Sequence, residues 1–131
     1  RDLRQLGGLG KAMPRLTACF FLLTFCSLGL PFLAGFAAEF LIFSGSFALA
    51  PTVTAIAVLG LLATAVFLLT ALQKAFTGPE QDRWAGLPDL SGAETATLLP
   101  ILVLIFWVGL MPDDWLTFSD ATSQFLAHLL R

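Results

Sequence analysis

One acidic side chain, Glu39, is the only charged residue between Leu16 and Gln73. The rest of this stretch is almost entirely apolar or carries small hydroxyl groups. Soluble domains contain about 25% charged residues, whereas this chain contains 12%. A carboxylate at bilayer depth costs about 3 kcal/mol on insertion scales, and such groups tend to mark ion or proton pathways. The stretch therefore predicts a membrane protein in which one carboxylate has a functional role.

Apolar segments predict an all-α, polytopic membrane protein with about four transmembrane helices. The expected spans are residues 13–30, 33–49, 52–76 and 93–111. Pro31 and Gly35 interrupt the apolar run, so the second span is expected to be a broken helix. Non-helical backbone at membrane depth is tolerated where protein or water covers it, and transporters place such breaks at ion sites. The alternative is a surface loop at 31–35, with Glu39 one turn inside the membrane.

The polar segments are expected to lie outside the membrane. Residues 1–15 form a connector and residues 77–94 a surface loop, and Ser91 and Glu94 have the spacing of a capping box before the last span. Trp107 and Trp115 suit a membrane interface. In the tail, residues 113–131, apolar side chains share one helical face, which predicts an amphipathic helix at the interface or against a neighbouring subunit. That face holds Phe118, Phe125, Leu126, Leu129 and Leu130, with Gln124, His128 and Arg131 opposite.

Several classes of function are disfavoured by the composition. The formal net charge is −2, so nucleic acid is not an expected partner. Cys19 and Cys26 lie about 10.5 Å apart along a helix axis, which is too far for a disulfide. No cluster of residues predicts a bound metal or cofactor. Because the chain begins with Arg1 and no signal peptide follows, we expect a piece of a longer polypeptide. We expect that it does not fold alone, since half of a channel wall would expose polar groups that the missing half should cover.

The charge distribution gives a first orientation. Four spans would put both ends of the chain on one side of the membrane and the 77–94 loop on the other. The ends hold more Lys and Arg than the loop, so the positive-inside rule would place them in the cytoplasm.

Longer motifs resemble a known family. They are residues 1–9 (RDLRQLGGL), Met13-Pro14, residues 28–31 (LGLP), residues 35–43 (GFAAEFLIF), Gly45-Ser-Phe47, Asp89-Leu-Ser91 with Glu94, and residues 109–112 (GLMP). In this order and at these spacings they resemble the C-terminal part of the antiporter-like subunits of respiratory complex I. The glutamate followed by phenylalanine at 39–40 favours the subunit M branch, the bacterial counterpart of mitochondrial subunit four; related branches usually have lysine there.

The resemblance implies a subunit of two inverted half-repeats, each with a discontinuous helix, in a bacterial inner membrane. It implies that Glu39 ends a chain of buried Glu and Lys residues that carries protons, that its cationic partner is a Lys or His upstream, and that the tail lies on the periplasmic side. FMN, iron–sulfur clusters and quinone would belong to other subunits. Two departures stand out: the family commonly has Pro-Gly at Pro31-Phe32 and Gly-Glu at Ala38-Glu39.

Three functions are weighed on this basis. The first is a proton-translocating subunit of NADH:quinone oxidoreductase that contacts other membrane subunits and lipid, with Glu39 as proton carrier. Burial disfavours the charged carboxylate, so alternating surroundings would let Glu39 take up and release a proton. The second is a subunit of a multi-subunit cation/proton antiporter or membrane-bound hydrogenase. The third is a structural membrane segment in which Glu39 anchors neighbouring helices.

Overall fold

Helices account for all the regular structure in residues 7–79, 81–84 and 86–129, which are the residues that the computed structural model describes. In chain order they are α1 (Leu9–Ala12), α2 (Pro14–Ser27), α3 (Ala34–Leu49), α4 (Pro51–Phe76), a short 3-10 turn η2 (Asp82–Trp84), α5 (Gly92–Leu110) and α6 (Pro112–Leu129). The expected all-α class is confirmed over these residues. Arg1, Arg4, Leu130 and Arg131, which entered the sequence predictions, lie outside them.

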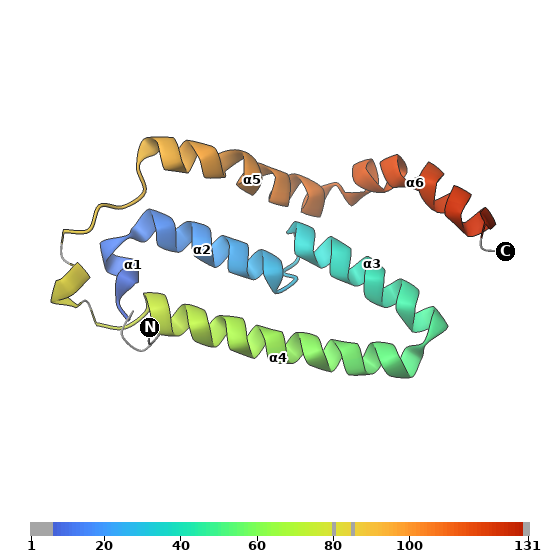
Figure 1. Ribbon diagram of the computed structural model, residues 1–131, viewed down its shortest axis with the longest axis horizontal. Coiled ribbons are helices and arrows are strands. Elements are labelled where there is room, and N and C mark those ends of the chain that lie inside the picture. The colour runs from blue at the N-terminus through green and yellow to red at the C-terminus, as the bar shows by residue number, and fades with distance from the viewer. Residues whose placement is uncertain (1–6, 80, 85, 130–131) are drawn as a thin grey trace.

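Helices α2 and α3 lie end to end and point the same way, and α4 runs back along both of them (Figure 1). With 14 and 16 residues, α2 and α3 are about 21 and 24 Å long at 1.5 Å per residue. Each is too short to cross a hydrocarbon core of about 30 Å, whereas the 26 residues of α4 measure about 39 Å. Together, α2 and α3 therefore match one crossing with an interruption in the middle.

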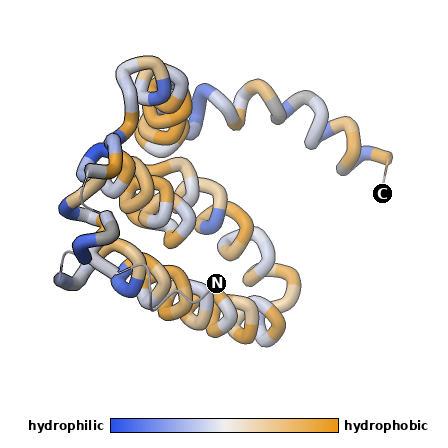
Figure 2. The backbone as a smooth tube through the Cα atoms, turned by 60° about the vertical axis from the view of Figure 1, so that its left-hand side comes forward, coloured by the Kyte–Doolittle hydropathy of each residue, from blue (hydrophilic) through white to orange (hydrophobic). Residues whose placement is uncertain are grey.

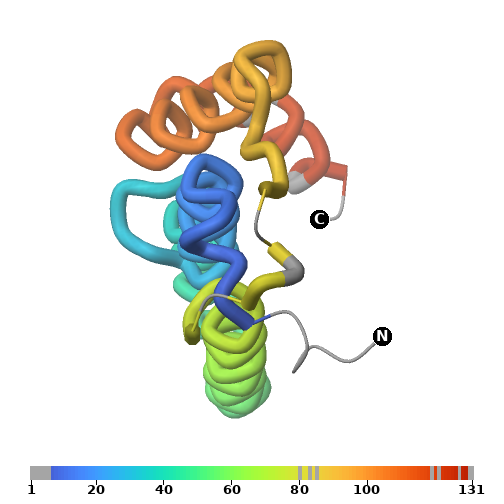
Figure 3. Tube along the Cα trace, turned by 90° about the vertical axis from the view of Figure 1, so that its left-hand side faces the viewer, coloured from blue at the N-terminus to red at the C-terminus, as the bar shows by residue number. Residues whose placement is uncertain are grey.

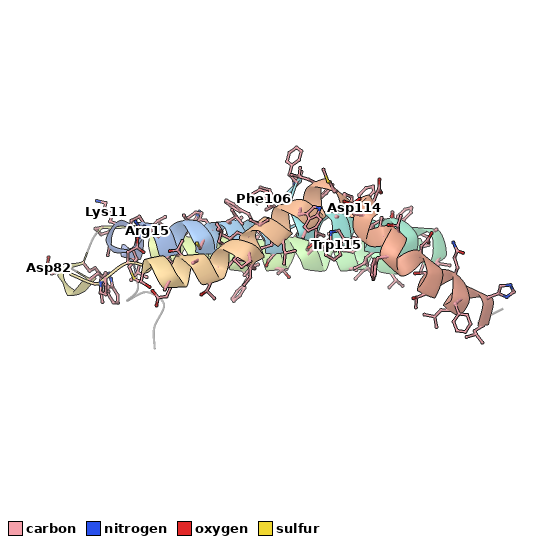
Figure 4. The ribbon with its side chains drawn as sticks, turned by 90° about the horizontal axis from the view of Figure 1, so that it is seen from above. Lys11, Arg15, Asp82, Phe106, Asp114 and Trp115 are labelled. Atoms are coloured by element: carbon pink, nitrogen blue, oxygen red, sulfur yellow. The ribbon has the colours of Figure 1, made fainter. Side chains whose placement is uncertain are left out.

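The expected count of four crossings is not confirmed. Two helices, α4 and α5, are individually long and apolar enough to cross a membrane. The end-to-end pair of α2 and α3 adds an interrupted third row. Consequently, the start of α2 and the loop after α4 lie at the same end of the molecule, and α6 extends toward the other end (Figures 1 and 4). The cytoplasmic placement of both chain ends depended on four spans, and it is therefore not supported.

The helix boundaries follow local signals in the sequence. Pro14, Pro51 and Pro112 each occupy the first turn of a helix, where the missing N–H costs nothing. The predicted capping box is present at the start of α5. The backbone N–H of Glu94 donates to Oγ of Ser91 at 3.3 Å, and the backbone N–H of Ser91 donates to Oε2 of Glu94 at 2.8 Å.

The three rows of helices form a layer, as the end-on view shows (Figure 3). Among the described residues the buried apolar side chains are Leu33, Leu72 and Phe76. Phe76, near the end of α4, contacts Phe20 of α2, with ring centroids 5.0 Å apart. Large apolar side chains elsewhere on α3, α4 and α5 are exposed, and the hydrophobic colouring runs along these helices (Figure 2). Such a surface is suited to lipid or to further helices.

A loop residue ties the ends of two rows together. The carboxylate of Asp89 accepts hydrogen bonds from the backbone N–H groups of Arg15, at 2.8 Å, and Leu16, at 3.2 Å. These are free amides in the first turn of α2. The Arg15 guanidinium in turn donates to the carbonyl of Leu90 at 3.3 Å. Asp89 thus caps α2 from the far side of the loop and fixes it beside the start of α5.

Two smaller expectations concern the cysteines and the tail. Cys19 and Cys26 are both free thiols, as their spacing predicted. Helix α6 projects beyond the rows (Figure 1), with Phe118 91% exposed and His128 on the exposed surface. At the junction of α5 and α6 the rings of Trp107 and Trp115 meet with centroids 5.7 Å apart.

Candidate functional site at the helix break

The C-terminus of α2 is closed by a Schellman motif. The backbone N–H of Leu30 donates to the carbonyl of Phe25 at 3.1 Å, and that of Gly29 to the carbonyl of Cys26 at 3.2 Å. Gly29 has φ +64, the left-handed conformation that this motif requires after the helix. Two carbonyls that the helix end would leave free are therefore satisfied, and the chain turns without reversing direction.

The chain re-enters a helix within a few residues. Pro31 cannot continue α2, and Leu33 is extended, with φ −108 and ψ 152, at the N-cap position of α3. Between them Phe32 has φ +76, which is unusual for a residue with a bulky side chain. This is the position at which the resembled family commonly carries glycine. Phe32 therefore adopts a left-handed conformation that glycine would take without strain.

Two further glycines let other backbone segments approach the break. A Cβ at Gly35 would overlap the carbonyl oxygen of Cys26, so the first turn of α3 lies directly against the last turn of α2. A Cβ at Gly109 would overlap the backbone of Phe32 and Leu33. Helix α5 therefore covers one side of the break at van der Waals distance, which leaves the interrupted helix well defined rather than loose.

Glu39 lies in the second turn of α3, and its carboxyl group reaches back to the break. A Cβ built on Gly29 would be 3.0 Å from the carboxyl carbon of Glu39 and closer still to Oε2. This direction agrees with the general lean of helical side chains toward the N-terminus of their helix. The Glu39 side chain is half-buried. Within the described part of the chain it has neither a hydrogen-bond partner nor an ion-pair partner.

The position of Glu39 along the helices favours an interrupted helix over a surface loop. From Glu39 to the α3–α4 turn at Ala50 the chain rises about 16 Å, roughly half of a hydrocarbon core of about 30 Å. The break lies beside the middle of α4, which extends past it in both directions (Figure 1). Beside the break is an apolar groove of about 430 Å³, lined in part by Phe21, Phe25 and Phe106.

The carboxylate that the sequence singled out and the break are therefore brought together. Sequence reasoning missed Gly29 as the backbone neighbour of Glu39, although the Gly-Leu-Pro run after an apolar segment is a known helix stop. It also missed Asp89 as the cap of α2. Outside the membrane-spanning helices, partial burial raises the pKa of Asp89, but the N–H groups of Arg15, Leu90 and Leu16 outweigh this and hold the pKa below its ordinary value.

Several known proteins are similar to this chain in sequence. Residues 1–67 match the family described as NADH:quinone oxidoreductase/Mrp antiporter, transmembrane. The NADH-quinone oxidoreductase subunit M of Pseudomonas aeruginosa is 36% identical over 122 residues, which are 93% of this chain and 24% of that protein. The F(420)H(2) dehydrogenase subunit M of Methanosarcina mazei is 33% identical over 98% of this chain and 26% of its own length.

A solved structure extends the likeness to three dimensions. A chain of respiratory complex I from Thermus thermophilus with bound NADH superposes with a TM-score of 0.77 at 33% identity. The match covers 85% of this chain and 23% of the other. The chain thus spans about a quarter of the length of the curated relatives it matches.

Proposed function

Because this chain belongs to the NADH:quinone oxidoreductase/Mrp antiporter transmembrane family, we propose that it forms the C-terminal part of a proton-translocating membrane subunit of a quinone-linked oxidoreductase. Glu39 is its proton carrier. The observation that carries this proposal is the carboxyl group of Glu39 lying against Gly29, at the interruption of a membrane helix. Similarity to subunits M of two oxidoreductases supports the assignment of the subunit.

A helix break suits a carboxyl group that must change its protonation state. Helix ends hold backbone amides and carbonyls that a continuous helix would use internally, so water or a polar neighbour can be held there at membrane depth. Glu39 reaches this point while its own helix remains intact. In dry surroundings the neutral acid is favoured, and contact with water or a cation favours the carboxylate. Alternation between the two moves one proton without making or breaking any bond except O–H.

The cationic partner of Glu39 and the redox chemistry are proposed to lie in other parts of the assembly. By family resemblance, a Lys or His on upstream helices supplies the positive charge that would draw the proton off Glu39. Flavin, iron–sulfur clusters and quinone would be held by other subunits, with which this chain is proposed to assemble. The relatives support that division, because one is named for F(420)H(2) and another for NADH although their membrane segments match the same chain.

Three crossings lead to a definite orientation. Lys11, Arg15 and Lys74 lie at the end of the layer that holds the 77–91 loop, and Asp114 at the start of α6 lies toward the opposite end (Figure 4). The positive-inside rule then places the end with Lys11, Arg15 and Lys74 in the cytoplasm of a bacterial inner membrane. Helix α6 is placed on the periplasmic side, where the family resemblance also puts the tail.

A cation/proton antiporter subunit is the second candidate, because the matched family includes Mrp antiporters. Glutamate rather than lysine at position 39, followed by Phe40, favours the oxidoreductase branch. Purification of the intact assembly decides between them. Chains that oxidise a reduced cofactor and hold iron–sulfur clusters would support the oxidoreductase, and small antiporter subunits or a hydrogenase would support the alternatives.

The carrier role is tested by Glu39→Gln in the full-length subunit and complete complex. The amide keeps the size of the side chain but cannot release a proton at this position. We expect the complex to assemble and oxidise its substrate while acidification of inverted membrane vesicles falls at least about tenfold. Asp114→Asn, which removes a carboxylate from the exposed start of α6, is the matched control and should pump normally. Normal pumping by the Glu39→Gln complex would reject the carrier role in favour of a structural one.

A further inference from the structure

The α-carbon of Gly29 forms part of the surface on which the Glu39 carboxyl group rests. A Cβ at Gly29 would lie 3.0 Å from the carboxyl carbon of Glu39 and 3.6 Å from Oε1, with Oε2 nearer than either. In glycine a hydrogen atom takes that place and faces the carboxyl group. No residue with a Cβ could occupy position 29 while Glu39 keeps its conformation.

Two separate requirements coincide at Gly29. The first is the left-handed conformation after α2, with φ +64, which glycine meets best and asparagine sometimes meets. The second is the absence of a Cβ, which the carboxyl group demands and asparagine would fail. A glycine needed only for its left-handed conformation would have open space at its Cβ position. Gly86, in the loop before α5, is an example, because it has φ +86 and no atom lies within 4 Å of its Cβ position.

We propose that Gly29 is a positioning residue for Glu39, holding the carboxyl group at the break between α2 and α3. This proposal rests on the proposed function of Glu39. A methyl group at position 29 would force the Glu39 side chain to rotate, which moves its carboxyl group away from the two helix ends. Displacements of about 1 Å can cost on the order of 100-fold in rate when a reacting group must be held in place.

Four variants of the full-length subunit in the intact complex test the contact through proton pumping. Gly29→Ala should lower pumping at least about tenfold. Glu39→Asp alone should also lower it, because the shorter side chain no longer reaches the break. The double variant G29A/E39D should pump no less than E39D alone, because the shorter carboxyl group no longer meets the new methyl group. Gly86→Ala should leave pumping unchanged, because it tests the same backbone conformation without the contact.

Normal pumping by G29A, or a further loss of pumping when G29A is added to E39D, would overturn the proposal. If G29A prevents assembly, the pair is tested with Glu39→Ala, which removes the overlapping carboxyl group. Assembly of G29A/E39A to the level of E39A would support the contact, and failure of both G29A and G29A/E39A would overturn it. Normal pumping by Glu39→Gln would reject the carrier role instead. The coupling of positions 29 and 39 in assembly would then still support the contact itself.

Discussion

Phe32 is the residue at which this chain strains its own backbone. Its φ of +76 places a β-carbon in the left-handed region, which costs about 1–2 kcal/mol for a residue other than glycine. Its ring is 68% exposed in this chain and contributes little burial in return. The strain persists because Gly29, Pro31 and the close approach of Gly109 fix the chain on both sides of it.

Phe32→Gly should therefore stabilise the protein. We expect the free energy of unfolding to rise by about 1 kcal/mol, because glycine accepts this φ without a steric penalty. The measurement is the thermal stability of the purified complex in detergent, with pumping retained. Phe36→Gly is the matched control, since Phe36 lies within α3 and glycine there should lower stability by about 1 kcal/mol. Equal destabilisation by both variants would show that Phe32 is not strained.

At the level of elements, α2 is held at both ends by contacts distant in sequence. Asp89 caps its first turn across a separation of 74 residues, and the break after Ser27 is covered by Gly109 of α5. Between these points Phe76 of α4 packs against Phe20, so the half-helix is fixed to both neighbouring rows.

Asp89→Ala should loosen the start of α2. With the carboxylate gone, the amides of Arg15 and Leu16 lose their acceptor, and their hydrogen exchange should become faster. The depressed pKa of Asp89 means that its contribution is fully present above the unfolded pKa of about 3.9 and is lost as the pH falls through the lower folded pKa. At neutral pH the cap should therefore be fully formed, and slow hydrogen exchange at these two amides should be lost only in strong acid. Asp82→Ala, in the same loop, is the control, and equal exchange in both variants would contradict the cap.

Local signals predicted the helix starts but not how the helices are joined. The prolines and the Ser91–Glu94 box act within a few residues, so the sequence alone indicates them. Whether the chain turns back or continues after Pro31 depends on Gly35 meeting Cys26 and on α5 meeting Phe32. Apolar periodicity carries no information on these contacts, so the sequence alone predicts residues 33–49 as a separate span. The same limit hid the contact between Gly29 and Glu39.

At the scale of the whole molecule, the layer has one end where basic side chains lie near the carboxylates of Asp82 and Asp89, and another end that carries α6 (Figure 4). Lys11, Arg15 and the loop after α4 share the first end (Figure 4). Large apolar side chains are exposed along α3, α4 and α5, and such a surface is suited to lipid or to further helices.

The proposed orientation, with three crossings, predicts which side chains can be reached from each side of the membrane. Single cysteines at Lys11 and Lys74, in a background without Cys19 and Cys26, should react with an impermeant thiol reagent from the cytoplasmic side. A cysteine at Asp120 in α6 should react from the periplasmic side. Labelling of intact cells compared with inverted vesicles measures this. Reaction of positions 11 and 120 from the same side would contradict three crossings and indicate an even number.

In the proposed mechanism the Glu39 carboxyl group gains and loses a proton during turnover. Infrared difference spectroscopy of the full complex follows the carbonyl stretch of protonated carboxylic acids directly. We predict a band that appears and disappears with turnover in the native complex and is missing in Glu39→Gln, while Asp114→Asn retains it. A turnover-dependent carboxylic acid band that is unchanged in Glu39→Gln would contradict the account.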